Sequence, residues 1–184
     1  MAREKMEKTN AVRILEQKKL PFSLHSYCCG EFTDGTAVAD LLGEPREQVF
    51  KTLVTVGKSG GYTVFVIPVA EELDRKKAAA AVGEKSLELL PVKELFPLTG
   101  YVRGGCTAIG MKKQFPTVLH VSAMEQDTIF VSGGRLGLQI QLKPEAVSYT
   151  HLSLLQTLSP EALCAGRWIA ARGKPSFYGQ RRAC

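Results

Sequence analysis

Two strand-like runs joined by a short turn constrain the fold of this chain more than any other feature. Residues 49–56 and 62–68 are rich in β-branched and aromatic side chains, and Gly57-Lys58-Ser59-Gly60-Gly61 between them has the composition of a turn. We therefore predict a β-hairpin. Its first strand contains Lys51, although lysine is depleted in strands and is rarely buried without a partner. This lysine predicts a cavity that needs a cation; the alternative is an edge-strand lysine that discourages aggregation.

Shorter elements flank the hairpin. Caps and periodicity predict helices from the N-cap Asn10 to Lys19, from Asp34-Gly35-Thr36 to Leu42, in one turn after Pro45, and over Leu73–Val82 and Pro91–Phe96. Alternation predicts strands at 22–27, 87–89, 118–121, 128–132 and 138–142. Several of these strands are adjacent and tightly joined, which favours an α+β fold with a mixed, largely antiparallel sheet over repeated βαβ units.

The C-terminal part of the chain has a different character. We predict one domain over residues 1–147 and an appended basic tail over residues 148–184, weakly structured or not native coding sequence. The stretch Ser153–Leu158 is the one part of the tail that could form a short helix. Much of the net charge of +6 lies in the tail, so the charge of the chain is weak evidence for nucleic-acid binding by the domain itself.

The chain shows no pattern typical of a targeting segment, a membrane span or a metal site. Met1–Lys8 is charged and lacks the apolar stretch of a signal peptide, and no run reaches the roughly eighteen apolar residues of a membrane helix. We expect a cytoplasmic protein. The five cysteines show no C-x-x-C spacing and the three histidines are scattered, so we predict neither disulfides nor a metal or other cofactor.

A glycine-rich segment, residues 101–113, is the second candidate feature. Gly105 and Gly110 have the G-x-x-x-x-G spacing, but Met111 stands where the P-loop lysine belongs, so nucleotide hydrolysis is not indicated. The backbone N–H groups of this segment could hold a carbonyl oxygen or an oxyanion, and a plain turn is the alternative. Cys106 could be a nucleophile, but no histidine or aspartate lies at a recognised spacing, which favours a small packing residue.

Weaker candidates lie elsewhere. Ser132-Gly133-Gly134 resembles many strand-end turns, and Tyr27 at a strand end is more typical of a core or rim aromatic residue. The pairs Lys76-Lys77 and Lys112-Lys113 could meet phosphates, although solvated surface lysines are the default.

In these segments the chain resembles the YbaK-type aminoacyl-tRNA deacylases. The resemblance runs in order over roughly residues 8–147, and it is carried by Lys8-Thr9-Asn10-Ala11, Leu20-Pro21-Phe22, Val49-Phe50-Lys51-Thr52-Leu53, Phe65-Val66-Ile67-Pro68, residues 73–78, 99–106 and 109–113, and 131–140. An ordered series of this kind is far more specific than any one motif. It implies a barrel-like version of the α+β fold, surrounded by helices.

The resemblance also implies an activity, partners and site residues. Family members hydrolyse Cys-tRNA(Pro) made by prolyl-tRNA synthetase, with Cys-tRNA(Cys) as a further substrate, and the substrate's own thiol attacks its carbonyl, which explains the lack of a protein nucleophile. The terms hydrolase and lyase are both expected. The implied catalytic residues are Lys51, Gly104 and Gly105, and the implied substrate-binding residues are Tyr27, Thr52, Cys106, Thr107, Ser132 and Gly133. The expected partners are mischarged tRNA(Pro), tRNA(Cys) and prolyl-tRNA synthetase.

One departure and two alternatives accompany this interpretation. The family has Ser-Pro where this chain has Thr107-Ala108, and the loss of proline frees φ at that position and loosens the loop. The alternatives are an editing deacylase of the Ala-tRNA(Pro) type and a non-catalytic module that binds tRNA or the synthetase.

Overall fold

The computed structural model describes residues 8–28, 35–150 and 155–158. Its strands are β1 (Phe22–Ser26), β2 (Phe50–Gly57), β3 (Tyr62–Pro68), β4 (Leu87–Leu89), β5 (Thr117–His120), β6 (Ile129–Ser132), β7 (Leu138–Leu142) and β8 (Leu155–Leu158). Its α-helices are α1 (Asn10–Gln17), α2 (Gly35–Leu42), α3 (Arg75–Val82), α4 (Val92–Thr99) and α5 (Pro144–Thr150). Two 3₁₀ helices, η1 (Arg46–Gln48) and η2 (Val121–Glu125), complete the described elements.

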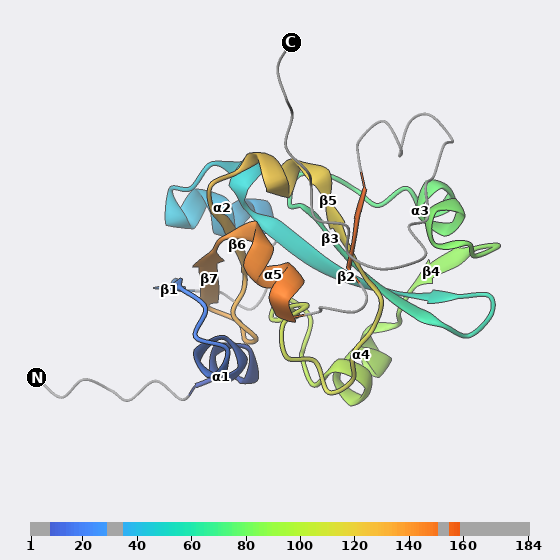
Figure 1. Cartoon of the computed structure of the whole chain (residues 1–184), viewed down its shortest axis with the longest axis horizontal. Coiled ribbons are helices and arrows are strands. Elements are labelled where there is room, and N and C mark those ends of the chain that lie inside the picture. The colour runs from blue at the N-terminus through green and yellow to red at the C-terminus, as the bar shows by residue number, and fades with distance from the viewer. Residues whose placement is uncertain (1–7, 29–34, 151–154, 159–184) are drawn as a thin grey trace, which may run out of the picture.

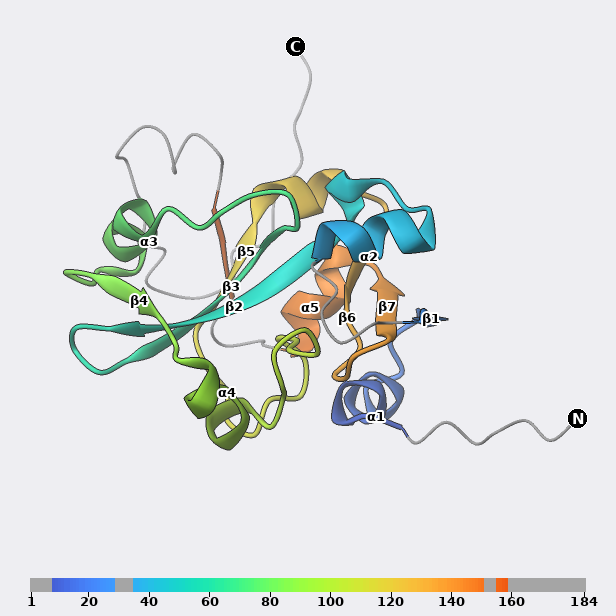
Figure 2. The same cartoon turned by 180° about the vertical axis from the view of Figure 1, so that it is seen from behind.

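The strands form two sheets, one of three strands in the order β1-β7-β6 and one of five in the order β4-β2-β3-β5-β8. The predicted hairpin is confirmed, because β2 and β3 pair antiparallel from Phe50–Pro68 to Val56–Tyr62. In Figures 1 and 2 this hairpin crosses the molecule, with α1 beside the three-stranded sheet at one end and α3 with β4 at the other.

The predicted mixed, largely antiparallel α+β fold is confirmed, but the sheets do not close into a barrel. Four of the six strand pairings are antiparallel, whereas β3–β5 and β5–β8 are parallel. Between the two sheets the ladder is reduced to one isolated parallel bridge, Val49–Phe130. Closure would need a continuous ladder of backbone hydrogen bonds at this junction.

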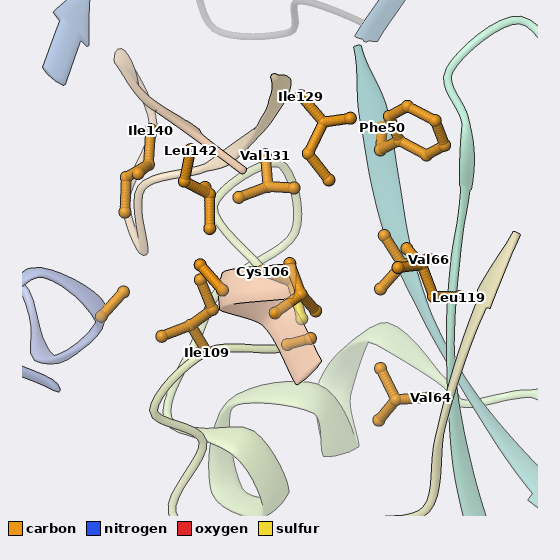
Figure 3. Close-up of a cluster of buried hydrophobic side chains, with 14 of the residues drawn as sticks. Phe50, Val64, Val66, Cys106, Ile109, Leu119, Ile129, Val131, Ile140 and Leu142 are labelled. Atoms are coloured by element: carbon orange, nitrogen blue, oxygen red, sulfur yellow. The ribbon is translucent and has the colours of Figure 1, made fainter. Parts of the chain in front are cut away.

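The main core lies between the two sheets. Phe50, Val64 and Val66 of the hairpin face Ile129, Val131, Ile140 and Leu142 of the three-stranded sheet (Figure 3). Burying one such side chain completely contributes about 1.5–3 kcal/mol. On the other face of the hairpin Phe65 and Ile67 pack under α3, so β3 is buried on both faces. This double burial explains its uninterrupted apolar sequence.

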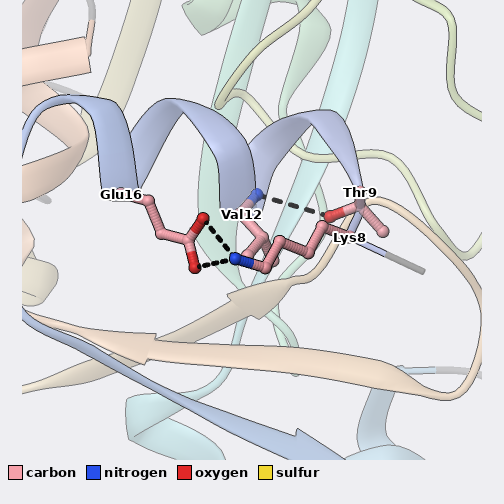
Figure 4. Close-up of polar contacts among 4 residues, drawn as sticks. All are labelled: Lys8, Thr9, Val12 and Glu16. Carbon is pink, nitrogen blue, oxygen red and sulfur yellow. Dashed lines mark hydrogen bonds and ion pairs between the residues drawn. The ribbon is translucent and has the colours of Figure 1, made fainter. Parts of the chain in front are cut away.

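The first helix begins at a different cap from the predicted one. Thr9, and not Asn10, is the N-cap, since its Oγ1 accepts a hydrogen bond from the backbone N–H of Val12 at 3.4 Å (Figure 4). Asn10 is the first helical residue, and its amide donates instead to the carbonyl of Gly110. The helix also ends at Gln17, before the predicted Lys19, because Lys19 adopts a φ of 54°. Lys8 and Glu16 form an exposed ion pair along α1.

Two other helix boundaries differ from the prediction. Helix α3 begins at Arg75, not at Leu73, because the Asp74 carboxylate accepts hydrogen bonds from the backbone N–H groups of the next turn. These bonds, chiefly the one from Lys77, lower the pKa of Asp74. Helix α4 continues past Phe96 and through Pro97 to Thr99. The predicted turn after Pro45 is confirmed as η1.

The C-terminal segment contains the clearest wrong prediction. Residues 155–158 form β8, which pairs with β5 in parallel, where we predicted a short helix over 153–158. The edge of β5 offers backbone groups that need partners, and this non-local pairing overrides the local helical pattern. Residues 151–154 and 159–184 of the predicted tail lie outside the described residues, and residue 147, where we placed the domain boundary, falls inside α5. Among the described residues, none of the helices has the length and apolarity that a bilayer crossing requires.

Candidate functional site

The three-stranded sheet has an apolar inner face and a polar outer face. Val131 and Ile140 point into the core, so the residues that alternate with them point outward. On the outer face Gln139 of β7 stands opposite both His25 of β1 and Ser132 of β6. The rings of His25 and Phe130 meet edge to face at 5.1 Å, which confirms that these strands share this side.

Strand β2 brings Lys51 to the same side. Val49 and Phe130 form the parallel bridge and pack together in one small cluster with Ala39 of α2. Lys51 and Ser132 each lie two residues beyond this bridge on strands that run in the same direction. Since side chains alternate along a strand, both extend from the side of Val49 and Phe130. The predicted lysine and the predicted serine therefore extend from the same side of the fold.

One hydrogen bond to the backbone fixes the Lys51 side chain on this side of the fold. Its side chain is partly buried, and its Nζ donates a hydrogen bond to the carbonyl of Val69 at 3.1 Å. An ammonium group has three donors, so this contact leaves capacity for a ligand. Strand β3 pairs with β2 at Lys51, whereas β4 pairs with β2 only from Thr55 to Gly57, so the sheet order does not decide against the edge-strand alternative.

The glycine segment reaches the same place through Gly104. The Ser132 hydroxyl donates to the Gly104 carbonyl at 3.4 Å, and Gly104 is exposed with a φ of 81°. A Cβ on Gly104 would lie 2.6 Å from Leu136, and a Cβ on Gly105 would lie 2.8 Å from the Cα of Arg135. Gly105 is therefore needed for the close packing of loop 102–105 against the backbone of loop 133–137, whereas Gly104 is needed chiefly for its positive φ.

The two predicted oxyanion donors are not equivalent. The N–H of Gly105 donates to the carbonyl of Val102 at 3.0 Å, so a turn already uses it. Of the two predicted N–H donors, only that of Gly104 therefore remains a candidate to bind an oxyanion. Gly105 contributes because it has no side chain.

Three of the predicted substrate-binding residues point into the core. Cys106 is 8% exposed among apolar side chains (Figure 3), and burial raises the pKa of its thiol to about 12. Thr107 is fully buried, and its hydroxyl accepts from the N–H of Ile109. Thr52 alternates with Phe50 and Val54, which belong to the main core. The structure thus separates these residues from the outer face that carries Lys51 and Ser132.

The segment that carries Thr107-Ala108 is anchored without the family's proline. The Tyr101 hydroxyl donates to the carbonyl of Ile109 at 2.8 Å and approaches that of Gly110 at 3.1 Å. Burial is the main cause that raises the pKa of Tyr101 to about 12, so this donor keeps its proton at neutral pH. The looser loop expected from the missing proline is therefore opposed by a buried hydrogen bond.

The outer face also contains a residue that the sequence analysis missed. Gln139 is 6% exposed, and its Oε1 has no hydrogen-bond partner among the described residues. A buried acceptor of this kind is costly unless a ligand or water satisfies it. The sequence shows only that Gln139 and Gln141 alternate with apolar residues on a predicted strand, which places both on one face without indicating burial.

The remaining predicted residues, Tyr27 and Gly133, make backbone contacts near loop 133–137. Tyr27 is half-buried, and its N–H donates to the carbonyl of Gly137, which joins the end of β1 to the loop after β6. The Gly133 carbonyl accepts from the Thr9 hydroxyl at 2.6 Å. Tyr27 and Gly133 therefore fix the loop around the site through backbone contacts.

Comparison with known proteins identifies the family of this chain. The family model for the aminoacyl-tRNA editing domain matches residues 32–148. A protein of Enterococcus faecalis (strain ATCC 700802 / V583), provisionally named Cys-tRNA(Pro)/Cys-tRNA(Cys) deacylase EbsC, is 48% identical over 149 residues, which cover 80% of this chain and 91% of that protein. This chain belongs to the aminoacyl-tRNA editing domain family.

Solved structures share the fold at lower identity. The hypothetical protein APE2540 is similar with a TM-score of 0.72 and 20% identity, covering 79% of this chain and 96% of that one. A structure described as a provisional trans-editing enzyme for prolyl-tRNA synthetase has a TM-score of 0.69 and 23% identity, covering 83% of this chain and 98% of that one. At these identities the likeness supports the fold alone.

Proposed function

We propose that this protein is a trans-editing hydrolase that deacylates mischarged Cys-tRNA(Pro), with Cys-tRNA(Cys) as a further substrate. The observation that carries the proposal is the convergence of Lys51, Ser132 and Gly104 on one side of the fold. Family membership and the name of the Enterococcus relative support the substrate class.

An aminoacyl ester is already activated, so the enzyme needs chiefly to position it and to stabilise developing charge. In this proposal Lys51 holds the aminoacyl or terminal ribose oxygens, and the amide of Gly104 faces the developing oxyanion.

The nucleophile in this proposal comes from the substrate. The cysteine thiol of Cys-tRNA attacks its own carbonyl carbon, the ester C–O bond breaks, and the tRNA leaves with its hydroxyl protonated. Cys106 is unsuited to the role because its buried thiol stays protonated at neutral pH. Water then opens the cyclic thioester, so the overall reaction is hydrolysis; the family and the relative support the term hydrolase and not the term lyase.

The expected partners follow from this substrate. The enzyme acts on tRNA(Pro), and on tRNA(Cys), after the synthetase has released them, and prolyl-tRNA synthetase supplies the mischarged Cys-tRNA(Pro). A cytoplasmic location follows from the place where tRNA is aminoacylated. We assign the activity to residues 1–147, although α5 runs across that boundary and β8 at 155–158 joins the five-stranded sheet.

The test is release of amino acid from Cys-tRNA(Pro), Ala-tRNA(Pro) and Pro-tRNA(Pro) by the purified protein. We expect release from Cys-tRNA(Pro) alone, because only cysteine carries the attacking thiol. Faster release from Ala-tRNA(Pro) would establish the Ala-tRNA(Pro) type of deacylase instead. Binding of tRNA without release from any of the three would establish a non-catalytic module.

A further inference from the structure

A cavity of about 180 Å³ lies between β3, β5 and α3. Lys51, Gly104 and Ser132 are not among the described residues that line it, so the cavity is separate from the candidate site. An engineered protein cavity of about 150 Å³ is large enough to bind benzene. The cavity beside α3 can therefore hold one six-membered ring with a short substituent.

The inner walls of this cavity are apolar. They belong to the hydrophobic cluster beneath α3, and the wall residues from that cluster are each at most 6% exposed: Phe65, Ile67, Ala78 and Val118. A ligand that fills the cavity must therefore have an apolar body.

The rim of the cavity is acidic. Glu71, Glu72 and Asp74 lie there with one lysine, Lys77. Asp74 is already used, because it accepts backbone hydrogen bonds at the start of α3 and contacts Lys77 at 3.9 Å. Glu71 and Glu72 are exposed, and no side chain in the described part of the chain donates a hydrogen bond to either carboxylate. Two carboxylates are thus available to a cationic group of a ligand, and an anion would be repelled.

A buried histidine supplies a hydrogen-bond donor inside the cavity. His120 is 5% exposed, and its Nδ1 accepts a hydrogen bond from the N–H of Ser122 at 3.3 Å. In a neutral imidazole the proton then lies on Nε2. This nitrogen faces Glu71, but the distance to the Glu71 Oε2 is 3.7 Å, which is too long for a hydrogen bond. The donor is therefore available to a ligand group that accepts a hydrogen bond.

We propose that this cavity binds a small primary amine that has an apolar body and a hydroxyl group on the carbon next to the aminomethyl carbon. The ammonium group donates to Glu71 and Glu72, the hydroxyl oxygen accepts from Nε2 of His120, and the apolar body lies against Phe65 and Val118. A mostly apolar hollow with a few polar groups that fix orientation is the usual form of a small-molecule site. The proposal goes beyond the deacylase activity and uses none of the residues assigned to it.

The first test compares three ligands of similar size by calorimetry on the full chain. The probe is 2-amino-1-phenylethanol, 2-phenylethylamine lacks its hydroxyl group, and phenylacetate replaces the ammonium group with a carboxylate. We expect saturable binding of the probe with a Kd below about 10 mM, binding of 2-phenylethylamine that is several-fold weaker, and no binding of phenylacetate. In His120→Phe the two amines should bind equally, because the donor to the hydroxyl group is lost.

The second test locates the bound amine with variants of matched charge. Glu71→Gln with Glu72→Gln removes the two free carboxylates and should weaken binding of the probe at least about tenfold. Glu47→Gln with Glu94→Gln removes two exposed acids away from the cavity and should leave the Kd unchanged. Ala78→Leu fills part of the cavity and should abolish binding; if this variant unfolds, Val118→Ile narrows the same space and should weaken binding.

Three results would overturn the proposal: no saturable binding of the probe below about 10 mM, equal losses in the two glutamate variants, or unaltered binding in the variants that fill the cavity. The deacylase proposal fails separately, since no tRNA is used in these experiments. Protein that binds the amine through Glu71 and Glu72 but releases no amino acid from Cys-tRNA(Pro) would support the cavity site and refute the deacylase. Protein that releases cysteine but does not bind the amine would do the reverse.

Discussion

Residues on the outer side of β2 and of the glycine segment differ from their chain neighbours on the inner side. Lys51 and Gly104 lie outward, where Lys51 contacts Val69 and Gly104 contacts Ser132. Thr52 and Cys106, one and two residues further on, turn toward the main core. Each of these two segments therefore contains both candidate chemistry and packing.

Neighbouring residues of one motif should therefore be assigned to a face of the fold before they are assigned a role in the site. Alternation along a strand sends neighbouring side chains to opposite faces, so adjacency in sequence argues against a shared site. Burial gives the second criterion: the same segment that exposes Gly104 raises the pKa of Cys106 to about 12. A family resemblance transfers all of these positions together, and only the structure separates them.

The largest effect on deacylation is expected when Lys51, which lies on the outer side, is replaced. Lys51→Ala should lower kcat/KM for Cys-tRNA(Pro) by at least about 100-fold, because it removes the one cation proposed to stabilise charge on the reacting ester. Deacylation rates and thermal unfolding are measured together, so that loss of folding is recognised. Lys58→Ala, an exposed lysine in the hairpin turn, is the matched control and should leave the rate unchanged. A Lys51→Ala enzyme with near wild-type activity would remove Lys51 from the mechanism.

A smaller effect on deacylation is expected when Cys106, which turns toward the main core, is replaced. Cys106→Ala should keep most of the deacylation rate and cost about 1 kcal/mol in the free energy of unfolding, as expected for a core truncation of one atom. With the thiol pKa near 12, Cys106 should also resist alkylation at pH 8 in the folded protein, whereas exposed Cys28 reacts. Mass spectrometry of the alkylated protein distinguishes the two. A Cys106→Ala variant as inactive as Lys51→Ala would show that the substrate-assisted scheme is wrong.

Local patterns predicted most of the fold. The hairpin, the strand at Leu138–Leu142 and the helix at Gly35–Leu42 are determined by alternation, turn residues and caps within each segment. Such patterns do not predict pairing between distant segments. Strand β8 and the isolated Val49–Phe130 bridge depend on contacts of this kind. The same limit applies to the barrel closure that the resemblance implied.

Part of the candidate site was likewise predictable from local patterns, and part of it was not. Lys51 was identified because a cation in an apolar strand breaks the local pattern, and Gly104 because glycine pairs mark unusual backbone. That Ser132 and Lys51 extend from the same side follows from a bridge between two sheets, which no local pattern encodes. Gln139 was missed because a glutamine on a half-polar strand is ordinary until its burial and its unpartnered oxygen are known.

The smallest expected effect concerns Thr52, which lies at the boundary between the two sides. Its Oγ1 is buried without a hydrogen-bond partner among the described residues. If this hydroxyl only packs, Thr52→Val replaces it with a methyl group of similar size and removes an unsatisfied oxygen, so stability should rise by up to about 1 kcal/mol and deacylation should stay near the wild-type rate. Urea unfolding and the Cys-tRNA(Pro) assay measure the two quantities, and Thr52→Ser, which keeps the hydroxyl, is the matched control. A lower rate for Thr52→Val that Thr52→Ser restores would show that the oxygen binds substrate, and it would move Thr52 from the inner side to the site.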